Sequence, residues 1–273
     1  MVVSRETLAG LRVALPRLKS DDAIAAALKT AGAQVDTFAL TQTIPIESAQ
    51  LEQVRQRLAA GYYAWVVLSS WRAAQAVLPQ LNALALAPAS APTRLAVVGQ
   101  STADWVNTHC ALKPALVGAG SAAKLLEVFP TPPTATTAPA STATTPTTPA
   151  TICLPQSQLA APTLAQGLSR LGWQVDAVAT YTTNPLPQLP AHLKTQWQAG
   201  TWDAVVVTAG SSAQALLQLL GPPPKKTAVV SIGQSTTARC RELGLRVDAT
   251  AATPRAEHIT QAIINLFKAK DFS

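Results

Sequence analysis

Short apolar runs followed by small or polar residues recur along the chain. Four of them are WVVL at 65–68, LAVV at 95–98, AVVV at 204–207 and AVVS at 228–231. Within two residues each is followed by Ser, Thr or Gly, and then by a segment with apolar residues at helical spacing. Continuous apolar runs of this length are typical of strands that are buried on both faces, and their alternation with helices predicts parallel sheets. The pattern therefore predicts an α/β protein.

The pattern also occurs twice. The matched segments share a strand, a small polar turn and a helix in the same order, and in the first pair also a Pro, a helix-ending Gly and a Gln-Val-Asp strand. The pairs are 14–40 with 153–180, 65–78 with 204–217, and 95–106 with 228–240. Internal repetition of βα units predicts that each half forms a small doubly wound α/β domain.

The tetrapeptide GQST follows an apolar run in both halves, at 99–102 and 233–236. A Gly at the carboxyl end of a strand lets the chain turn sharply, and we expect Ser or Thr to cap the next helix through its side-chain oxygen. Backbone N–H groups at such turns suit a carboxylate or phosphate, and open α/β sheets bind ligands at these strand ends. Two domains presenting such turns to each other would form a cleft for several anionic groups. Duplicated helix caps without a ligand are the alternative, and the sequence leaves both open.

Residues 130–151 contain only Pro, Thr, Ala and one Ser. Such a segment has nothing large to bury and cannot offset the entropy lost on ordering. The composition predicts a flexible, extended insertion with no catalytic role.

The overall composition narrows the function classes. Hydrophobic residues make up 48% and charged residues 13% of the chain, which is typical of a soluble globular protein. The net charge of +7 favours an anionic partner, but the basic residues are scattered and Lys225-Lys226 is the only adjacent pair, so we expect no nucleic-acid binding. No signal peptide and no apolar stretch of membrane-spanning length are evident, and we expect a cytoplasmic protein.

Few residues carry obvious chemistry. No dinucleotide-binding, P-loop or hydrolase-elbow motif occurs, and neither the cysteines nor the histidines have metal-site spacing, so we expect reduced, mostly buried thiols and no metal. These residues are Cys110, Cys153, Cys240, His109, His192 and His258. Tyr181 stands out because it follows an apolar strand where the chain leaves the second βαβ unit. Its phenol can donate a proton or simply pack at a hinge. Trp71 lies in a strand-end loop, whereas the other five tryptophans fit core positions.

Six motifs in chain order resemble the uroporphyrinogen-III synthase family over nearly the whole chain. They are VVLSSWRAAQAVL, LAVVGQSTADWV, GAGSAAKLLEVF, ICLPQSQLAAPTLAQGLSRLGWQVDAVATYTT, DAVVVTAGSSAQALL and VVSIGQSTTARCRELGLRV. Only the Pro/Thr-rich insertion has no counterpart in that pattern.

The resemblance implies two flavodoxin-like α/β domains joined by two strands. One domain would be discontinuous, with residues 1–42 and 184–273, and the other would span 43–183. It also implies a monomer without a cofactor that converts hydroxymethylbilane, a linear polycarboxylate, into uroporphyrinogen III with loss of water and inversion of the terminal pyrrole ring. A non-catalytic tetrapyrrole-binding or regulatory homologue of the same fold is the alternative.

The resemblance also implies site residues. Tyr181 matches the tyrosine proposed to assist departure of the hydroxyl group. The substrate-binding residues would be Arg17, Ser69, Ser70, Arg72, Gln100, Ser101, Thr102, Ser121, Thr208, Ala209, Gly210, Ser211, Gln234, Ser235 and Thr236. Three positions depart from the family pattern: Trp71 replaces a common proline, Ala209-Gly210 replaces a Ser-Pro type turn, and Gln156 replaces a basic residue.

Overall fold

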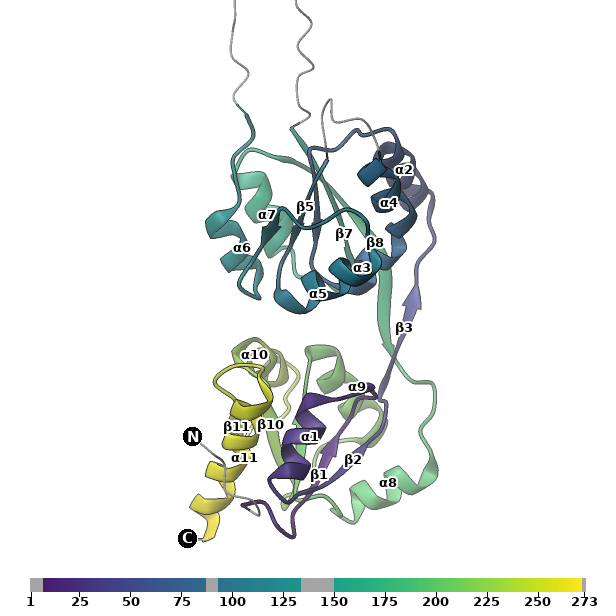
Figure 1. The fold of residues 1–273 in the computed structure, drawn as a ribbon. Coiled ribbons are helices and arrows are strands. Elements are labelled where there is room, and N and C mark those ends of the chain that lie inside the picture. The colour runs from purple at the N-terminus through teal and green to yellow at the C-terminus, as the bar shows by residue number, and fades with distance from the viewer. Residues whose placement is uncertain (1–6, 87–92, 134–149, 272–273) are drawn as a thin grey trace, which may run out of the picture. The chain divides into compact units, whose positions relative to one another are not determined.

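The computed structural model describes residues 7–86, 93–133 and 150–271, which divide into two compact units (Figure 1). Unit 1 comprises Met1–Gln42 and Thr183–Ser273, and unit 2 comprises Thr43–Thr182. The chain passes from one unit to the other along strands β3 (Thr41–Pro45) and β8 (Gln174–Pro185), which are neighbours in one sheet.

Among the described residues, unit 1 contains a five-stranded sheet in the order β11-β10-β9-β1-β2, with the recorded pairings all parallel. The strands are β1 (Arg12–Leu15), β2 (Gln34–Thr37), β9 (Ala204–Val207), β10 (Ala228–Ser231) and β11 (Ala249–Thr250). The helices are α1 (Ala23–Thr30), α8 (Ala191–Gln198), α9 (Gly210–Leu220), α10 (Gln234–Glu242) and α11 (Ala256–Asp271). Numbered within the unit, the order is that of flavodoxin-like folds.

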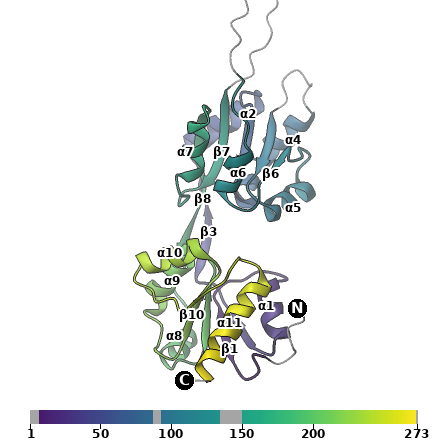
Figure 2. The same cartoon turned by 90° about the vertical axis from the view of Figure 1, so that its left-hand side faces the viewer.

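Apolar side chains cover both faces of this sheet, and helices cover them in turn (Figure 2). Val206 belongs to the cluster beneath α1 and α11, whereas Val205 and Val207 belong to the cluster beneath α8, α9 and α10. Successive strand residues point to opposite faces, so a strand buried on both sides must be apolar throughout. This explains the uninterrupted run AVVV.

Within the described part of unit 2, the sheet has six strands in the order β3-β8-β7-β4-β5-β6. Its remaining strands are β4 (Trp65–Leu68), β5 (Arg94–Val97), β6 (Leu116–Val117) and β7 (Thr151–Ser157). The helices are α2 (Ala49–Ala59), α3 (Trp71–Ala76), α4 (Leu78–Leu86), α5 (Gln100–His109), α6 (Ala122–Val128) and α7 (Thr163–Arg170). Val66 and Leu68 pack beneath α2 to α5, and Val67 packs beneath α6 and α7.

The two sheets have the same spatial order when unit 2 is read from β8. The series β8-β7-β4-β5-β6 then corresponds to β2-β1-β9-β10-β11. Even the register is repeated, because Val13 pairs with Ala204 in unit 1 and Ile152 pairs with Trp65 at the equivalent positions in unit 2. The predicted fold class, two flavodoxin-like parallel α/β halves, is confirmed.

The repeated Gln-Val-Asp strands carry equivalent structural carboxylates. Asp36 accepts a hydrogen bond from Trp202 Nε1 at 2.7 Å, and Asp176 accepts one from the Tyr63 hydroxyl at 2.9 Å. Trp202 and Tyr63 are both buried just before equivalent strands. Each carboxylate also pairs with an arginine at 2.7 Å: Asp36 with Arg12, and Asp176 with Arg57. Each aspartate therefore stabilises the fold of its own unit rather than carrying chemistry.

The predicted insertion at 130–151 falls mostly on residues 134–149, which lie outside the described residues. Both described flanks are attached to unit 2. The Pro130 carbonyl accepts a hydrogen bond from Trp173 Nε1 at 2.7 Å, and Thr151 is a buried residue of β7 that pairs with Gln174. The prediction therefore placed one strand residue, Thr151, in the insertion. A β-strand register cannot be read from a Thr that follows a Pro/Thr-rich run.

The cysteines and helices match further expectations within the described ranges. Cys110, Cys153 and Cys240 are buried free thiols, and burial raises the pKa of each. None of the described helices is both long enough and apolar enough to cross a bilayer.

Candidate functional site

The turns at the carboxyl ends of neighbouring strands lie close together in unit 2. After β5 and β6 the two turns are in contact at their glycines, because a Cβ placed on Gly99 would lie 3.0 Å from the Cα of Gly120. A side chain at position 99 would therefore press on the Gly120 backbone, which favours Gly there. The amide groups of these two turns therefore lie side by side at one edge of the sheet.

The GQST turns differ from the prediction in one respect. The N-cap residues are the glycines, Gly99 and Gly233, and neither helix start has a side-chain cap hydrogen bond. The prediction that Ser or Thr caps these helices is wrong, because the chain enters the helix one residue after the Gly and places Gln, Ser and Thr in its first turn. The first N–H groups of a helix have no intrahelical acceptor. They are therefore suitable donors to an anion.

Burial separates the predicted residues of the GQST turns. Thr102 and Thr236 are each 6% exposed, so their side chains belong to the interior of their units. The side chains of Ser101 and Ser235, and of the glutamines before them, are at least partly exposed. Contacts to a ligand from these turns would come from backbone amides, Gln and Ser rather than from the Thr hydroxyl groups.

Tyr181 and Ser70 lie together in unit 2. The Tyr181 hydroxyl oxygen is 3.0 Å from Ser70 Oγ, and either atom can be the donor. Ser70 is the N-cap of α3 and also accepts a hydrogen bond from the Ala73 amide at 3.2 Å. In β8 the register shifts so that Ser157 pairs with Tyr181 directly after Gln156 pairs with Ala179. Bulges of this kind re-aim side chains, and here the irregularity occurs at Tyr181.

A pocket of about 700 Å³ opens beside Tyr181 within unit 2. Of the predicted site residues, Arg72 and Tyr181 line it. The other lining residues come from β3, β8, helices α2 to α4 and the segments next to them: Thr43, Pro45, Glu47, Glu52, Arg55, Trp71, Gln75, Ala76, Pro79, Gln80 and Thr180.

Arg72 is an available cation at this pocket. Its guanidinium carbon lies 4.5 Å from the centroid of the Trp71 ring, a cation–π arrangement that holds the side chain in place. No described carboxylate forms an ion pair with Arg72. Trp71, the residue that departs from the family pattern, thus supports a charge that is free to meet an anion.

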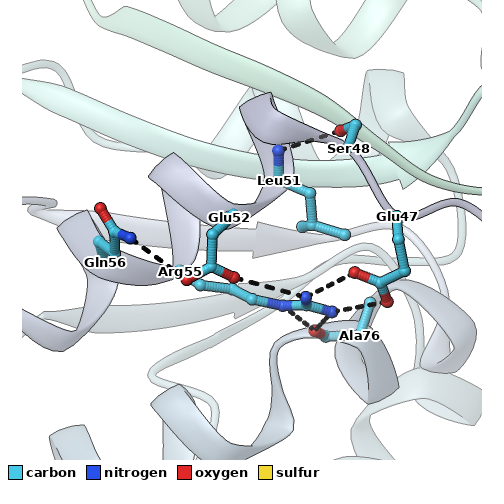
Figure 3. A network of polar contacts seen from close by, with 7 residues as sticks. All are labelled: Glu47, Ser48, Leu51, Glu52, Arg55, Gln56 and Ala76. Atoms are coloured by element: carbon cyan, nitrogen blue, oxygen red, sulfur yellow. Dashed lines mark hydrogen bonds and ion pairs between the residues drawn. The ribbon is translucent and has the colours of Figure 1, made fainter.

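Arg55 is the second arginine that lines the pocket, and its charge is paired with the Glu47 carboxylate (Figure 3). Nη1 and Nη2 donate to the two carboxylate oxygens of Glu47 at 2.6 and 3.1 Å, and Nε and Nη2 donate to the Ala76 carbonyl at 3.1 Å. The Glu52 carboxylate lies 3.8 Å away. The Arg55 hydrogen bond holds the pKa of Glu47 below its ordinary value. Arg55 therefore organises the pocket wall and does not offer a free charge.

In unit 1, Arg17 is paired rather than free. Its Nε and Nη2 donate to both oxygens of Asp22, each at 2.6 Å. The Asp22 side chain is 4% exposed and caps α1 by accepting from Ile24 and Ala25. Burial opposes its ionisation, but the hydrogen bonds and charge of Arg17 outweigh it and lower the pKa of Asp22. Arg17 thus compensates a buried carboxylate, with part of its guanidinium remaining for another partner.

The predicted residues Thr208, Ala209, Gly210 and Ser211 connect β9 to α9, and all are partly exposed. Ala209 is the N-cap without a side-chain bond. A Cβ on Gly210 would lie 2.5 Å from Cγ of Arg239, so the Arg239 side chain packs against this turn because position 210 is Gly.

Sequence reasoning missed Arg239, Arg55 and Glu47. Arg239 could have been found from the sequence, because it lies about one helical turn after Thr236 and shares its helix with the second GQST. The Arg55–Glu47 pair could not, because it depends on how the segment after β3 packs against α2. The predicted residues thus form two groups. Unit 2 holds Ser69, Ser70, Arg72, Gln100, Ser101, Thr102, Ser121 and Tyr181, and unit 1 holds the others.

These features describe a class of protein: an α/β protein with two predominantly parallel sheets and amide-bearing turns at their strand ends, where such folds bind small ligands. The family model "Uroporphyrinogen-III synthase HemD" matches residues 22–261. The chain belongs to the uroporphyrinogen-III synthase family. Membership of this family makes it an enzyme of haem biosynthesis.

Solved structures of the same family share the fold. A mutant uroporphyrinogen III synthase from Thermus thermophilus is 17% identical with a TM-score of 0.58, and the match covers 95% of this chain and 100% of that chain. Uroporphyrinogen-III synthetase from Helicobacter pylori is 14% identical with a TM-score of 0.59, covering 94% of this chain and 99% of that chain. No curated protein matches the chain.

Proposed function

We propose that this chain is a cyclising hydro-lyase that converts hydroxymethylbilane into uroporphyrinogen III. The observation that carries the proposal, in a chain of this family, is the Tyr181–Ser70 hydrogen bond beside a pocket that also contains Arg72, which has no ion-pair partner among the described residues. A hydroxyl pair next to a free cation suits a reaction that expels water from a polycarboxylate.

The substrate is a flexible chain of pyrroles that bears many carboxylates. We propose that the first-turn amides after β5, β6, β9 and β10 bind these carboxylates, together with the exposed Gln and Ser side chains of both GQST turns. Helix N-termini favour anions through their N–H groups and dipoles. Arg72 adds a full charge in unit 2. Arg239 packs against the turn after β9 in unit 1, but its Nη1 already donates to Glu242 at 2.9 Å, so only the rest of its guanidinium is available.

Tyr181 would assist the loss of water. Ser70 Oγ accepts from the Ala73 amide, so its own hydroxyl hydrogen can point to the Tyr181 oxygen. The Tyr181 O–H is then available to the hydroxymethyl oxygen of the substrate. As the carbon–oxygen bond breaks, Tyr181 donates to the departing oxygen, and the bond from Ser70 stabilises the charge that develops on the phenol.

Ring closure follows from positioning. Loss of water leaves an electron-poor methylene carbon, which the substituted carbon of the terminal pyrrole attacks before that ring rearranges and inverts. The proton that the substrate releases on closure restores the Tyr181 phenol. The free substrate closes without inversion, so the protein must hold the chain in the less accessible geometry. Positioning can contribute roughly 7–11 kcal/mol to a barrier in favourable systems. A site with few titratable groups is adequate for that task.

We further propose that the protein acts as a cytoplasmic monomer and needs no cofactor, nucleic acid or membrane. The substrate supplies both reacting ends, so the reaction requires no redox partner.

The product isomer tests this function. Purified protein is supplied with freshly generated hydroxymethylbilane, and the porphyrins are separated after oxidation. The proposal predicts the type III isomer in excess of a heat-inactivated control. Type I alone would contradict it, and saturable binding of the bilane without a change of isomer ratio would favour the non-catalytic homologue.

A further inference from the structure

Helix α3 follows directly on Ser70 and ends at Ala76. It is a helix of six residues, Trp71–Ala76, too short to be stable without tertiary contacts. Its start presents Ser70 to Tyr181 and Arg72 to the pocket. The position of the whole helix therefore determines the geometry of the Tyr181–Ser70 pair.

Arg55 fixes the other end of this helix. Two of its nitrogens donate to the Ala76 carbonyl, one of the last carbonyls of α3, which have no intrahelical donor (Figure 3). A cation at a helix C-terminus is also favoured by the helix dipole. The Arg55 side chain is 21% exposed, so its contacts are partly shielded from water.

Glu47 fixes Arg55 in turn. Its carboxylate accepts hydrogen bonds from both terminal nitrogens of the guanidinium, and this bidentate pair has a defined orientation (Figure 3). Glu47 follows Ile46, whose amide donates to the Thr180 carbonyl at 3.0 Å. Thr180 precedes Tyr181 in β8.

These contacts close a ring around the pocket. It runs from the Tyr181 hydroxyl through Ser70, along α3 to Ala76, and through Arg55, Glu47 and Ile46 back to the residue before Tyr181. We propose that Arg55 is a positioning residue for the reaction, because it closes this ring and holds Ser70 against Tyr181. The inference rests on the proposed function.

Four proteins test it: wild type, Arg55→Gln, Tyr181→Phe and the double variant. Steady-state kcat and KM are measured for uroporphyrinogen III formation, with thermal unfolding followed for each protein. Arg55→Gln is expected to lower kcat about tenfold, because small misplacements of reacting groups are costly. In the Tyr181→Phe background the same change should lower kcat less than about twofold, since residues acting as a unit are not additive.

Two further variants probe the contacts themselves. Arg55→Lys keeps the charge but loses the fork, so its kcat should fall between those of wild type and Arg55→Gln. Glu47→Gln keeps the Arg55–Ala76 contact and should lower kcat about threefold, again only when Tyr181 is present. It serves the same test if Arg55→Gln does not fold.

Arg57→Gln is the matched control. Arg57 is on the same helix, and it pairs with Asp176 away from the residues that line the pocket. The kcat of Arg57→Gln should stay within about twofold of the wild-type value even if the substitution lowers the unfolding temperature.

The outcomes separate the two claims. Equal losses from Arg55→Gln in both backgrounds, or no loss in either, would overturn the positioning role while type III formation by the wild type upholds the function. A wild type that forms only type I would overturn both.

Discussion

The hydroxyl oxygen of Tyr181 lies 3.0 Å from Oγ of Ser70, the residue that caps α3. Ser70 therefore has two roles, one in the helix and one beside the phenol. The Ala73 amide occupies an acceptor site of Ser70 and so favours Ser70 as the donor to Tyr181. This arrangement would leave the phenol proton for the substrate.

Changes at this pair should affect turnover more than folding. Tyr181→Phe is expected to lower kcat about 100-fold, the lower end of the range for acid catalysis, with its unfolding temperature nearly unchanged. Ser70→Ala should lower kcat as well and cost about 1 kcal/mol of stability through the lost cap. Ser48→Ala, the equivalent loss at the start of α2, is the control for capping and should keep its kcat. An unaltered kcat in Tyr181→Phe would remove Tyr181 from the mechanism.

Arg72 should contribute to substrate binding. Arg72→Gln is expected to raise KM about tenfold with kcat changed little, because an exposed charge acts on bound and reacting substrate alike. Added salt should raise the KM of the wild type and have less effect on the variant. Arg94→Gln is the matched control. The guanidinium carbon of Arg94 also lies over a tryptophan, 5.7 Å from the centroid of the Trp65 ring, but Arg94 does not line the pocket. Equal KM values for the two variants would argue against a role for Arg72.

The two GQST glycines should differ in their tolerance of a methyl group. A Cβ on Gly99 would press on the Gly120 backbone at 3.0 Å, whereas a Cβ on Gly233 would meet no atom within 4 Å among the described residues. Gly99→Ala should therefore cost about 1–2 kcal/mol of unfolding free energy, and Gly233→Ala less than about 0.5 kcal/mol. Denaturant unfolding of both variants checks this, and the reverse order would contradict the packing.

Asp22 should make stability depend on pH in the acid range. Its pKa in the folded protein lies below the ordinary value of 3.8, because the Arg17 contacts outweigh the effect of burial. The contribution is therefore fully present above the unfolded-state pKa and is lost as pH falls through the folded-state pKa. At pH 7, Asp22→Asn should reduce the unfolding free energy by about 1–3 kcal/mol.

The difference between wild type and Asp22→Asn should shrink on acidification below pH 3.8. Asp21→Asn is the control, since Asp21 is exposed and Asn tolerates its φ of 50°. A difference that grows with acidification would refute the assignment.

The apolar runs and the repeat were sufficient to predict two sheets of parallel α/β type. They did not predict which segments share a sheet, because β1 pairs with β9 rather than with β4. Runs such as Val205–Val207 are apolar throughout because both faces of their strand are buried, and that requirement is visible in the sequence. The helix-ending glycines Gly32 and Gly172 also followed from the pattern, since both have the positive φ that favours Gly.

The details of the site could not be predicted in the same way. The irregularity of β8 at Tyr181 depends on its pairing with Ser157, and the Arg17–Asp22 pair depends on a buried helix cap. Both are set by tertiary packing, which composition and spacing do not record. The Arg55–Glu47 pair is of the same kind. The residue types of a site are therefore easier to predict from the sequence than the hydrogen-bond and ion-pair partners of each residue.

The proposed function is tested most sharply by the isomer composition that wild type and Tyr181→Phe form from hydroxymethylbilane at early times. We expect the wild type to form mainly the type III isomer and the variant to form it more slowly, with more type I from spontaneous closure. Only type I from the wild type, at the rate of the protein-free solution, would contradict the proposed function.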